Sequence, residues 1–198
     1  MPDRSELDDR VAATLSAGAP GAAAAAVVSA LGPALLGYLA AILRSESDAR
    51  EVFSEVAEEI LAAISGFRGE SAVKTWSYRI AWRTAMRFRE SPERRRGRRL
   101  LTEEAAALVE EVRSSTATYL RDDTKAWLAR VRAELSFEDQ SLLTLRVDRD
   151  LSWAEVAQVM GGDDQTAALA RLRKRFERIK ERLRVEAERE GLLGGDDG

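Results

Sequence analysis

The chain of 198 residues contains neither cysteine nor histidine. Without cysteine there is no disulfide or thiolate chemistry, and without histidine the commonest general base and zinc ligand is missing. The sequence also shows no phosphate loop of the form G-x-x-x-x-G-K-[ST], no paired catalytic carboxylate motif and no metal-ligand cluster. We therefore expect no enzyme, no catalytic residues, no cofactor and no metal site.

We also expect no apolar, charge-free run of the 18 or more residues that a membrane-spanning helix needs. The alanine-rich stretch 22–26 lacks the basic start and the strongly apolar centre of a signal peptide. The chain is therefore predicted to have no membrane insertion. The absence of cysteine suits a reducing cytoplasm, which is the expected location.

Charged residues of both signs are frequent, but they lie in separate segments of the chain. The formal net charge is −3 and the pI is about 5.3, which on average disfavours a nucleic-acid partner. Basic residues nevertheless gather at 87–99 and 171–184, whereas 46–59 and 103–111 are acidic. Local patches rather than totals set the affinity for phosphate, so binding to nucleic acid stays open.

Apolar residues recur at helical spacing through most of the chain, and this predicts an all-α protein with two small helical domains joined by a linker. Leu31, Leu35, Leu39 and Leu43, for example, mark a core helix that could bend at Pro33. The predicted divisions are a flexible tail at 1–26, a first domain at 27–99, an acidic linker at 100–123, a second domain at 124–190 and a tail at 191–198. A loosely held first helix is the alternative for residues 1 to about 21.

A helix that begins near residue 48 is predicted to have an acidic face. It buries Val52, Phe53 and Val56, and its opposite face carries Glu51, Ser54, Glu55, Glu58 and Glu59. Such a strip suits docking on a basic protein surface. The alternative is an ordinary solvated helix face.

The stretch 67–83 combines a loop signal with a helix that carries rings and cations. The loop is F-R-G-E-S at 67–71, and Tyr78, Trp82 and Arg83 are expected away from the buried side of the helix. Proteins bind single-stranded nucleic acid with aromatic rings that stack on bases and with cations that contact phosphates. An amphipathic helix with solvated arginines is the alternative.

The second domain ends in a predicted helix-turn-helix. Ser152 and Glu155 form a capping box, Gly161 and Gly162 stop that helix, and a strongly basic helix follows at about 164–190. In a helix-turn-helix the second helix enters the major groove. A basic amphipathic helix can equally bind a membrane or a partner protein.

Several of these motifs together resemble the extracytoplasmic-function (ECF) sigma factors, the small specificity subunits of bacterial RNA polymerase. The motifs are D-A-R-E-V-F-S-E-V at 48–56, F-R-G-E-S at 67–71, T-W-S-Y-R-I-A at 75–81, L-S-W-x-E-V-A-x-V-M-G at 151–161 and L-R-K-R-F-x-R at 172–178. The resemblance covers roughly 30–99 and 124–186, in the order that the family has.

The resemblance implies a sigma factor that binds core RNA polymerase and promoter DNA, and it assigns roles by position. The residues that would contact a coiled coil of the largest polymerase subunit are Asp48, Glu51, Ser54 and Glu55. Those that would handle the opening promoter are Arg68, Lys74, Trp76, Tyr78, Arg79 and Arg83. Those that would read or clamp the distal promoter box are Arg171, Arg173, Lys174, Arg175 and Arg178.

The chain departs from the family at several positions. Ser54 stands where the family has glutamine and Ala57 where it has phenylalanine, which thins the polymerase-binding face. A stand-alone helix-turn-helix regulator with sigma-like ancestry is therefore the alternative function.

The segment between Gly161 and Leu172 is longer than in the family, so either the turn is enlarged or the last helix gains about one turn. The sequence does not decide whether an anti-sigma protein also binds the chain.

Overall fold

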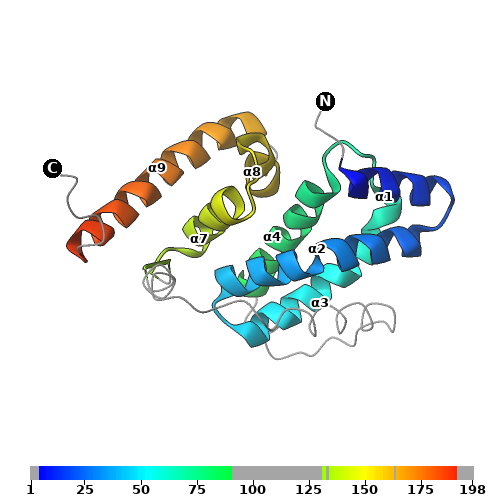
Figure 1. The fold of residues 1–198 in the computed structure, drawn as a ribbon, viewed down its shortest axis with the longest axis horizontal. Helices are drawn as coiled ribbons and strands as arrows, with labels where there is room; N and C mark the ends of the chain where they lie inside the picture. The colour runs from blue at the N-terminus through cyan, green and yellow to red at the C-terminus, as the bar shows by residue number, and fades with distance from the viewer. Residues whose placement is uncertain (1–4, 91–130, 133, 163, 191–198) are drawn as a thin grey trace, which may run out of the picture. The chain divides into compact units, whose positions relative to one another are not determined.

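The computed structural model describes residues 5–90, 131–132, 134–162 and 164–190 (Figure 1). All regular structure in these ranges is helical, which confirms the all-α prediction. The chain divides into two compact units, Met1–Tyr119 and Leu120–Gly198. The predicted linker at 100–123, the basic run at 94–99 and the tail at 191–198 lie outside the described residues.

The first unit is built around one long apolar helix. Its helices are α1 (Glu6–Ser16), α2 (Pro20–Leu43), α3 (Glu46–Ala63) and α4 (Val73–Glu90), with a 3₁₀ turn at Ile64–Gly66 after α3. Helix α2 packs against α1, α3 and α4 (Figure 1). The largest fully buried side chains of this core are Leu35, Tyr38, Leu39, Phe53, Ile60, Ile64, Tyr78 and Phe88.

Where a flexible tail or a first helix was expected, residues 6–16 form helix α1, which packs against α2. Ser5 caps α1 through its side chain, and Val11 in that helix is fully buried. Helix α2 then begins at Pro20, where a proline costs no hydrogen bond because the first helical N–H has no intrahelical partner. The periodicity is weak here because small alanines, rather than large apolar residues, form much of the contact.

Helix α2 also corrects the expectation that no apolar run of membrane-spanning length exists. Its 24 residues include no charged side chain, and by length and composition alone it could cross a membrane. Within the unit it is instead covered by its neighbours along one side, where Leu35, Tyr38 and Leu39 are fully buried. Its strong hydropathy is therefore explained by its place at the centre of a helical bundle.

The second unit contains three helices within its described residues. They are α7 (Phe137–Leu143), α8 (Trp153–Met160) and α9 (Gln165–Arg189), and a π-helical turn at Thr144–Asp148 follows α7. Helix α9 packs against both α7 and α8. Leu142, Leu145, Leu151 and Val156 are fully buried between them.

The predicted capping box at the start of α8 is present. The Ser152 hydroxyl accepts a hydrogen bond from the Glu155 backbone N–H at 3.3 Å, and the Glu155 carboxylate accepts one from the Ser152 N–H at 2.8 Å. Helix α9 begins at Gln165, with the Asp164 side chain accepting a bond from the Ala167 N–H at 2.9 Å. The additional residues after Gly161 therefore extend α9 at its start.

Gly161 is required where α8 meets α9. A Cβ atom at this position would lie 2.3 Å from the Ala157 carbonyl oxygen and 2.8 Å from the Ala168 Cβ. Both neighbours are backbone or a buried methyl group, so neither can move aside without shifting a helix. Glycine thus allows the close approach on which the helix-turn-helix depends.

We predict that Gly161→Ala destabilises the second unit by about 1–3 kcal/mol, the usual effect of overpacking. Hydrogen exchange of the α8 and α9 amides measures this change in the second unit alone. Gly21→Ala, at an exposed α2 position with no atom within 4 Å of the added Cβ, is the matched control and should be neutral or stabilising. Unchanged exchange in α8 and α9 of Gly161→Ala would contradict the packing argument.

Candidate nucleic-acid and partner interfaces

The acidic face of α3 is centred on Asp48 and Glu51, one helical turn apart and both half-buried. Burial raises the pKa of the Glu51 carboxyl above its usual value, and the charges of Asp48 and then Glu55 raise it further. The described residues include no group of three or more acidic side chains placed to hold a metal ion. This concentration of negative charge is therefore suited to a cationic partner surface.

Two of the four residues predicted to contact polymerase are not accessible. Ser54 is 7% exposed, and its hydroxyl donates to the Arg50 carbonyl oxygen at 2.9 Å. Glu55 is 8% exposed. The prediction placed both on an open face, but helix α3 buries a wider arc than its large apolar residues indicate. Asp48 and Glu51 remain as accessible candidates.

Another part of the predicted acidic strip serves the fold. The Glu59 carboxylate forms an ion pair with Arg87 and accepts a hydrogen bond from the Thr84 hydroxyl at 3.2 Å. These contacts fasten α3 to α4. Sequence analysis missed this pair because its members are far apart in the chain and no local spacing relates them.

The rings of α4 are buried, which corrects the prediction that they handle DNA. Tyr78 is 1% exposed and packs edge-on against Tyr38 of α2, with ring centroids 5.3 Å apart. Trp76 is 8% exposed, and its ring lies 5.3 Å from that of Phe67. Trp82 is buried as well. These side chains hold the bundle together and are not placed to stack on bases.

The reason is that α4 packs against three other helices, so far more than one stripe is covered. Small polar residues make this possible. The Ser77 hydroxyl donates to the Val73 carbonyl oxygen at 2.8 Å, and the Thr84 hydroxyl shares its one proton between the Ile80 carbonyl oxygen at 3.0 Å and the Glu59 carboxylate. Their hydrogen-bonding capacity is satisfied, so burying them costs little.

The predicted cations of this region lie nearer the surface. Arg83 is exposed, while Lys74 and Arg79 are half-buried. Arg68 is exposed in the loop before α4 and pairs with Glu70 at 2.9 Å. The accessible part of the proposed DNA site is thus the loop at 67–72 together with one charged flank of α4.

Asp8 of α1 also belongs to this region, although sequence analysis did not identify it. Its carboxylate accepts a hydrogen bond at 2.6 Å from the backbone N–H of Val73, the first residue of α4. The spacing of Ser5 and Asp8 is a capping signal for α1, but nothing in the local sequence points to Val73.

Helix α9 carries many basic residues, and the structure separates them by what they contact. Arg171, Lys174 and Arg178 are exposed and share one face of the helix. No hydrogen bond, ion pair or ring contact joins them to another described residue. From residue 180 onward the cations of the helix are paired: Lys180 with Glu177, Arg182 with Glu134, Arg184 with Glu181 and Glu188, and Arg189 with Glu186.

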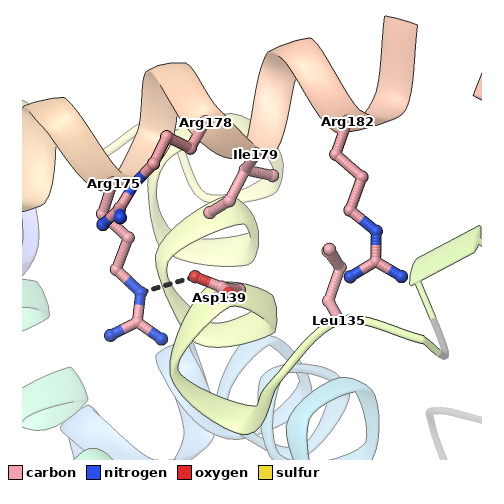
Figure 2. A pocket seen from close by; sticks show the side chains of 6 residues that line it. All are labelled: Leu135, Asp139, Arg175, Arg178, Ile179 and Arg182. Carbon is pink, nitrogen blue, oxygen red and sulfur yellow. Dashed lines mark hydrogen bonds and ion pairs between the residues drawn. The ribbon is translucent and has the colours of Figure 1, made fainter. Parts of the chain in front are cut away.

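Arg175 has a structural role, and its predicted role in clamping DNA stays a prediction. Its guanidinium pairs with Asp139 and donates to the Ser136 hydroxyl at 2.9 Å, so that it joins α9 to the beginning of α7. Figure 2 shows the Arg175–Asp139 contact, which lies beside a hollow. The hollow has a volume of about 330 Å³ and is also lined by Leu135, Arg178, Ile179 and Arg182.

Arg173 is exposed, as Arg171, Lys174 and Arg178 are, but it also takes part in a contact within the second unit. Its guanidinium carbon is 5.7 Å from the centre of the Trp153 ring, a cation–π contact, and the side chain is exposed. The Trp153 ring also packs edge-on against Phe176, with centroids 5.3 Å apart. Trp153 therefore joins the start of α8 to α9 and orients Arg173.

Comparison with known proteins places this architecture in a family. The model of sigma-70 region 2 matches residues 27–96. The chain is 30% identical to the RNA polymerase sigma-H factor of Pseudomonas aeruginosa over 132 residues, which is 64% of the chain and 68% of that protein. It is 22% identical to the RNA polymerase sigma factor SigV of Bacillus subtilis over 150 residues, 76% of the chain and 82% of that protein.

No match was found among solved structures. The region 2 match spans α2, α3 and α4, which carry the acidic cluster and the loop with its charged flank. The first relative is matched over two thirds of its own length, and both matches extend beyond a single region. The chain belongs to the sigma-70 family of RNA polymerase sigma factors.

Proposed function

We propose that the chain is an ECF-type sigma factor that directs bacterial core RNA polymerase to specific promoters and assists their opening. The observation that carries this proposal is the similarity to a named sigma factor over two thirds of that protein's length. The same similarity favours a sigma factor over a stand-alone regulator. On this proposal the protein acts beside polymerase in the cytoplasm and catalyses no reaction of its own.

Polymerase binding is assigned to the acidic cluster of α3. Asp48 and Glu51 are accessible, and the charge of the buried Glu55 beside them adds to the negative potential that a basic partner surface meets. The expected partner surface is the coiled coil of the largest polymerase subunit. Complementary charge of this kind accelerates association and fixes the register of the complex.

Promoter opening is assigned to the loop at 67–72 and the charged flank of α4. With Trp76 and Tyr78 in the core, the α4 rings do not supply the base stacking. Arg68 and Arg83 are exposed and Arg79 is half-buried, so we assign to them the contacts with the backbone of the separated strand, and to the loop the contact with an unpaired base. Unpairing a base costs a few kcal/mol, which such contacts can offset without a catalytic residue.

Recognition of the distal promoter box is assigned to α9. Arg171, Lys174 and Arg178 lie on one exposed face over about 10 Å of the helix, at 1.5 Å per residue. An α-helix fits the major groove of DNA, where arginine and lysine bind guanine edges and phosphates. Arg173 lies on another face, held by Trp153, and is assigned a contact at the edge of the groove.

We predict that the protein added to core RNA polymerase gives transcripts that start at defined sites, whereas core enzyme alone does not. Run-off transcription on a genomic fragment library measures this directly. A gel shift with and without core enzyme separates the two candidate functions, since a stand-alone regulator binds promoter duplex by itself. Failure of the protein to associate with core polymerase would refute the sigma-factor proposal.

We predict that Glu51→Gln weakens binding to core polymerase about tenfold, because a charged group of the docking face is lost. The same change should stabilise the chain slightly at neutral pH, by at most about 0.5 kcal/mol, because it removes repulsion from Asp48 and Glu55. Titration with labelled core enzyme and thermal unfolding measure the two effects. Glu6→Gln, an exposed acid in the first turn of α1, is the matched control.

The effect of pH on the stability of the wild type relative to Glu51→Gln has a definite sign. The pKa of Glu51 is higher in the folded chain than its usual value, so the folded state binds the proton more tightly than the unfolded state does. The free energy of unfolding of the wild type therefore falls relative to that of Glu51→Gln as the pH rises from about 4.5 through the raised pKa. Above that pKa the difference between the two unfolding free energies no longer changes. If Glu51→Gln binds core polymerase as tightly as the wild type does, Glu51 is not part of the interface.

We predict that Lys174→Gln and Arg178→Gln each weaken promoter binding by the assembled enzyme and reduce its salt dependence by about one phosphate contact. Promoter affinity measured from low to high salt gives this slope. The matched control is Lys180→Gln on the same helix, because Lys180 is paired with Glu177 and lies away from the proposed face. If Lys180→Gln changes the slope as much as Lys174→Gln does, the exposed face is not the DNA-binding face.

A further inference from the structure

The Asp8 carboxylate connects the starts of two helices. One of its oxygens accepts hydrogen bonds from the Ser5 backbone N–H at 3.0 Å and from the Ser5 hydroxyl at 2.5 Å. The other accepts the bond from the Val73 N–H at 2.6 Å, across 65 residues of sequence. The side chain is 8% exposed, so water competes little for these bonds. Both oxygens of a buried carboxylate are thus used to hold α1 against α4.

The bond to Val73 has a specific effect on α4. The first N–H groups of a helix have no partner within the helix, and the positive end of its dipole favours a negative charge. Ala72 is the residue just before α4, and its carbonyl oxygen accepts a hydrogen bond from the Trp76 N–H at 3.0 Å, the first backbone bond of the helix. Asp8 therefore caps the first N–H of α4 from another helix.

The loop before α4 is consequently fixed at both ends. At its start, the Phe67 N–H donates to the Ile64 carbonyl at 3.0 Å and the Phe67 ring packs on Trp76. At its end, Asp8 holds Val73. Between these anchors Arg68 is exposed, and Gly69 turns the chain with a φ of 69°, which glycine adopts without strain.

We propose that Asp8 is a positioning residue for promoter opening and that α1 is part of the strand-capturing apparatus. This inference rests on the proposed function, because it concerns the loop to which opening is assigned. Helix α1 lies outside residues 27–96, the part matched by sigma-70 region 2, so the match assigns it no role. Asp8 itself does not touch DNA: it determines where the loop and the first turn of α4 are held.

The test compares Asp8→Asn with two controls in the same helix. Asp9→Asn removes an exposed charge next to Asp8 and leaves the cap in place. Val11→Ala loosens the packing of α1 at a fully buried position and leaves the Asp8 carboxylate unchanged. Val11→Ala thus lowers stability without removing the bond to Val73, which separates a loss of positioning from a loss of folding.

All four proteins are assembled with core polymerase on a promoter that the wild-type enzyme has selected from random-sequence DNA. Three quantities are measured: affinity for core enzyme, affinity for a single-stranded oligonucleotide copied from the opened strand, and fluorescence of a base analogue in the opening region. We expect Asp8→Asn to bind the strand about tenfold more weakly and to open the promoter less, with unchanged affinity for core enzyme. Asp9→Asn and Val11→Ala should match wild type in strand capture.

Two outcomes would overturn the inference: strand capture by Asp8→Asn equal to wild type, or an equal defect in Val11→Ala at the same loss of melting temperature. If Asp8→Asn does not fold, Ser5→Ala replaces it, because that change removes the hydroxyl that orients the carboxylate and keeps the bond to Val73. A two- to threefold loss of capture then supports the inference, and no loss overturns it. Failure of the wild-type enzyme to capture the strand is a different result, since it refutes the assigned opening function itself.

Discussion

The packing of α4 against three other helices determines what the first unit can present to a partner. Because α1, α2 and α3 each contact it, the rings that look from the sequence like a stacking platform are used as core. What remains outside is a flank of cations and the loop at 67–72. A deeply buried helix is also a rigid one, so a loop attached to its first residue has a well-defined position. Burial of the aromatic residues and positioning of the loop are thus two consequences of the same packing.

The large apolar residues and the capping motifs made the helices predictable. The leucines of α2 and the Ser152–Glu155 box mark their elements because the physics is local: periodic burial and satisfaction of the first N–H groups. Tyr78 was misplaced because a periodicity argument assumes one buried stripe, whereas three neighbours cover a wider arc of α4. Helix α1 was expected only as the alternative to a flexible tail, since its alanines and a single Val11 give a weak pattern.

The candidate site was predictable to a smaller degree than the fold. The presence of a basic last helix follows from composition, but which of its cations are available depends on partners elsewhere in the chain. Arg175 is engaged by Asp139 and Ser136 from α7, which no spacing within α9 could indicate. The pairing of Lys180 with Glu177 is local and could have been anticipated from the i, i+3 rule. Residue-level assignment therefore needs the tertiary contacts even where the family is evident.

The two units use charge in opposite ways, and this explains why both kinds of surface occur in one chain. In α3, Glu51 keeps a partly buried carboxylate beside two like charges at a cost in folding free energy, which fits its proposed role in binding another protein. In α9, most cations are neutralised by neighbouring acids, so only a narrow face is left with uncompensated charge. Compensation of the rest limits non-specific attraction to DNA, since each uncompensated cation adds affinity for any phosphate backbone. A subunit that must find a few promoters among many other sites benefits from a small, geometrically defined set of exposed cations more than from a large basic surface.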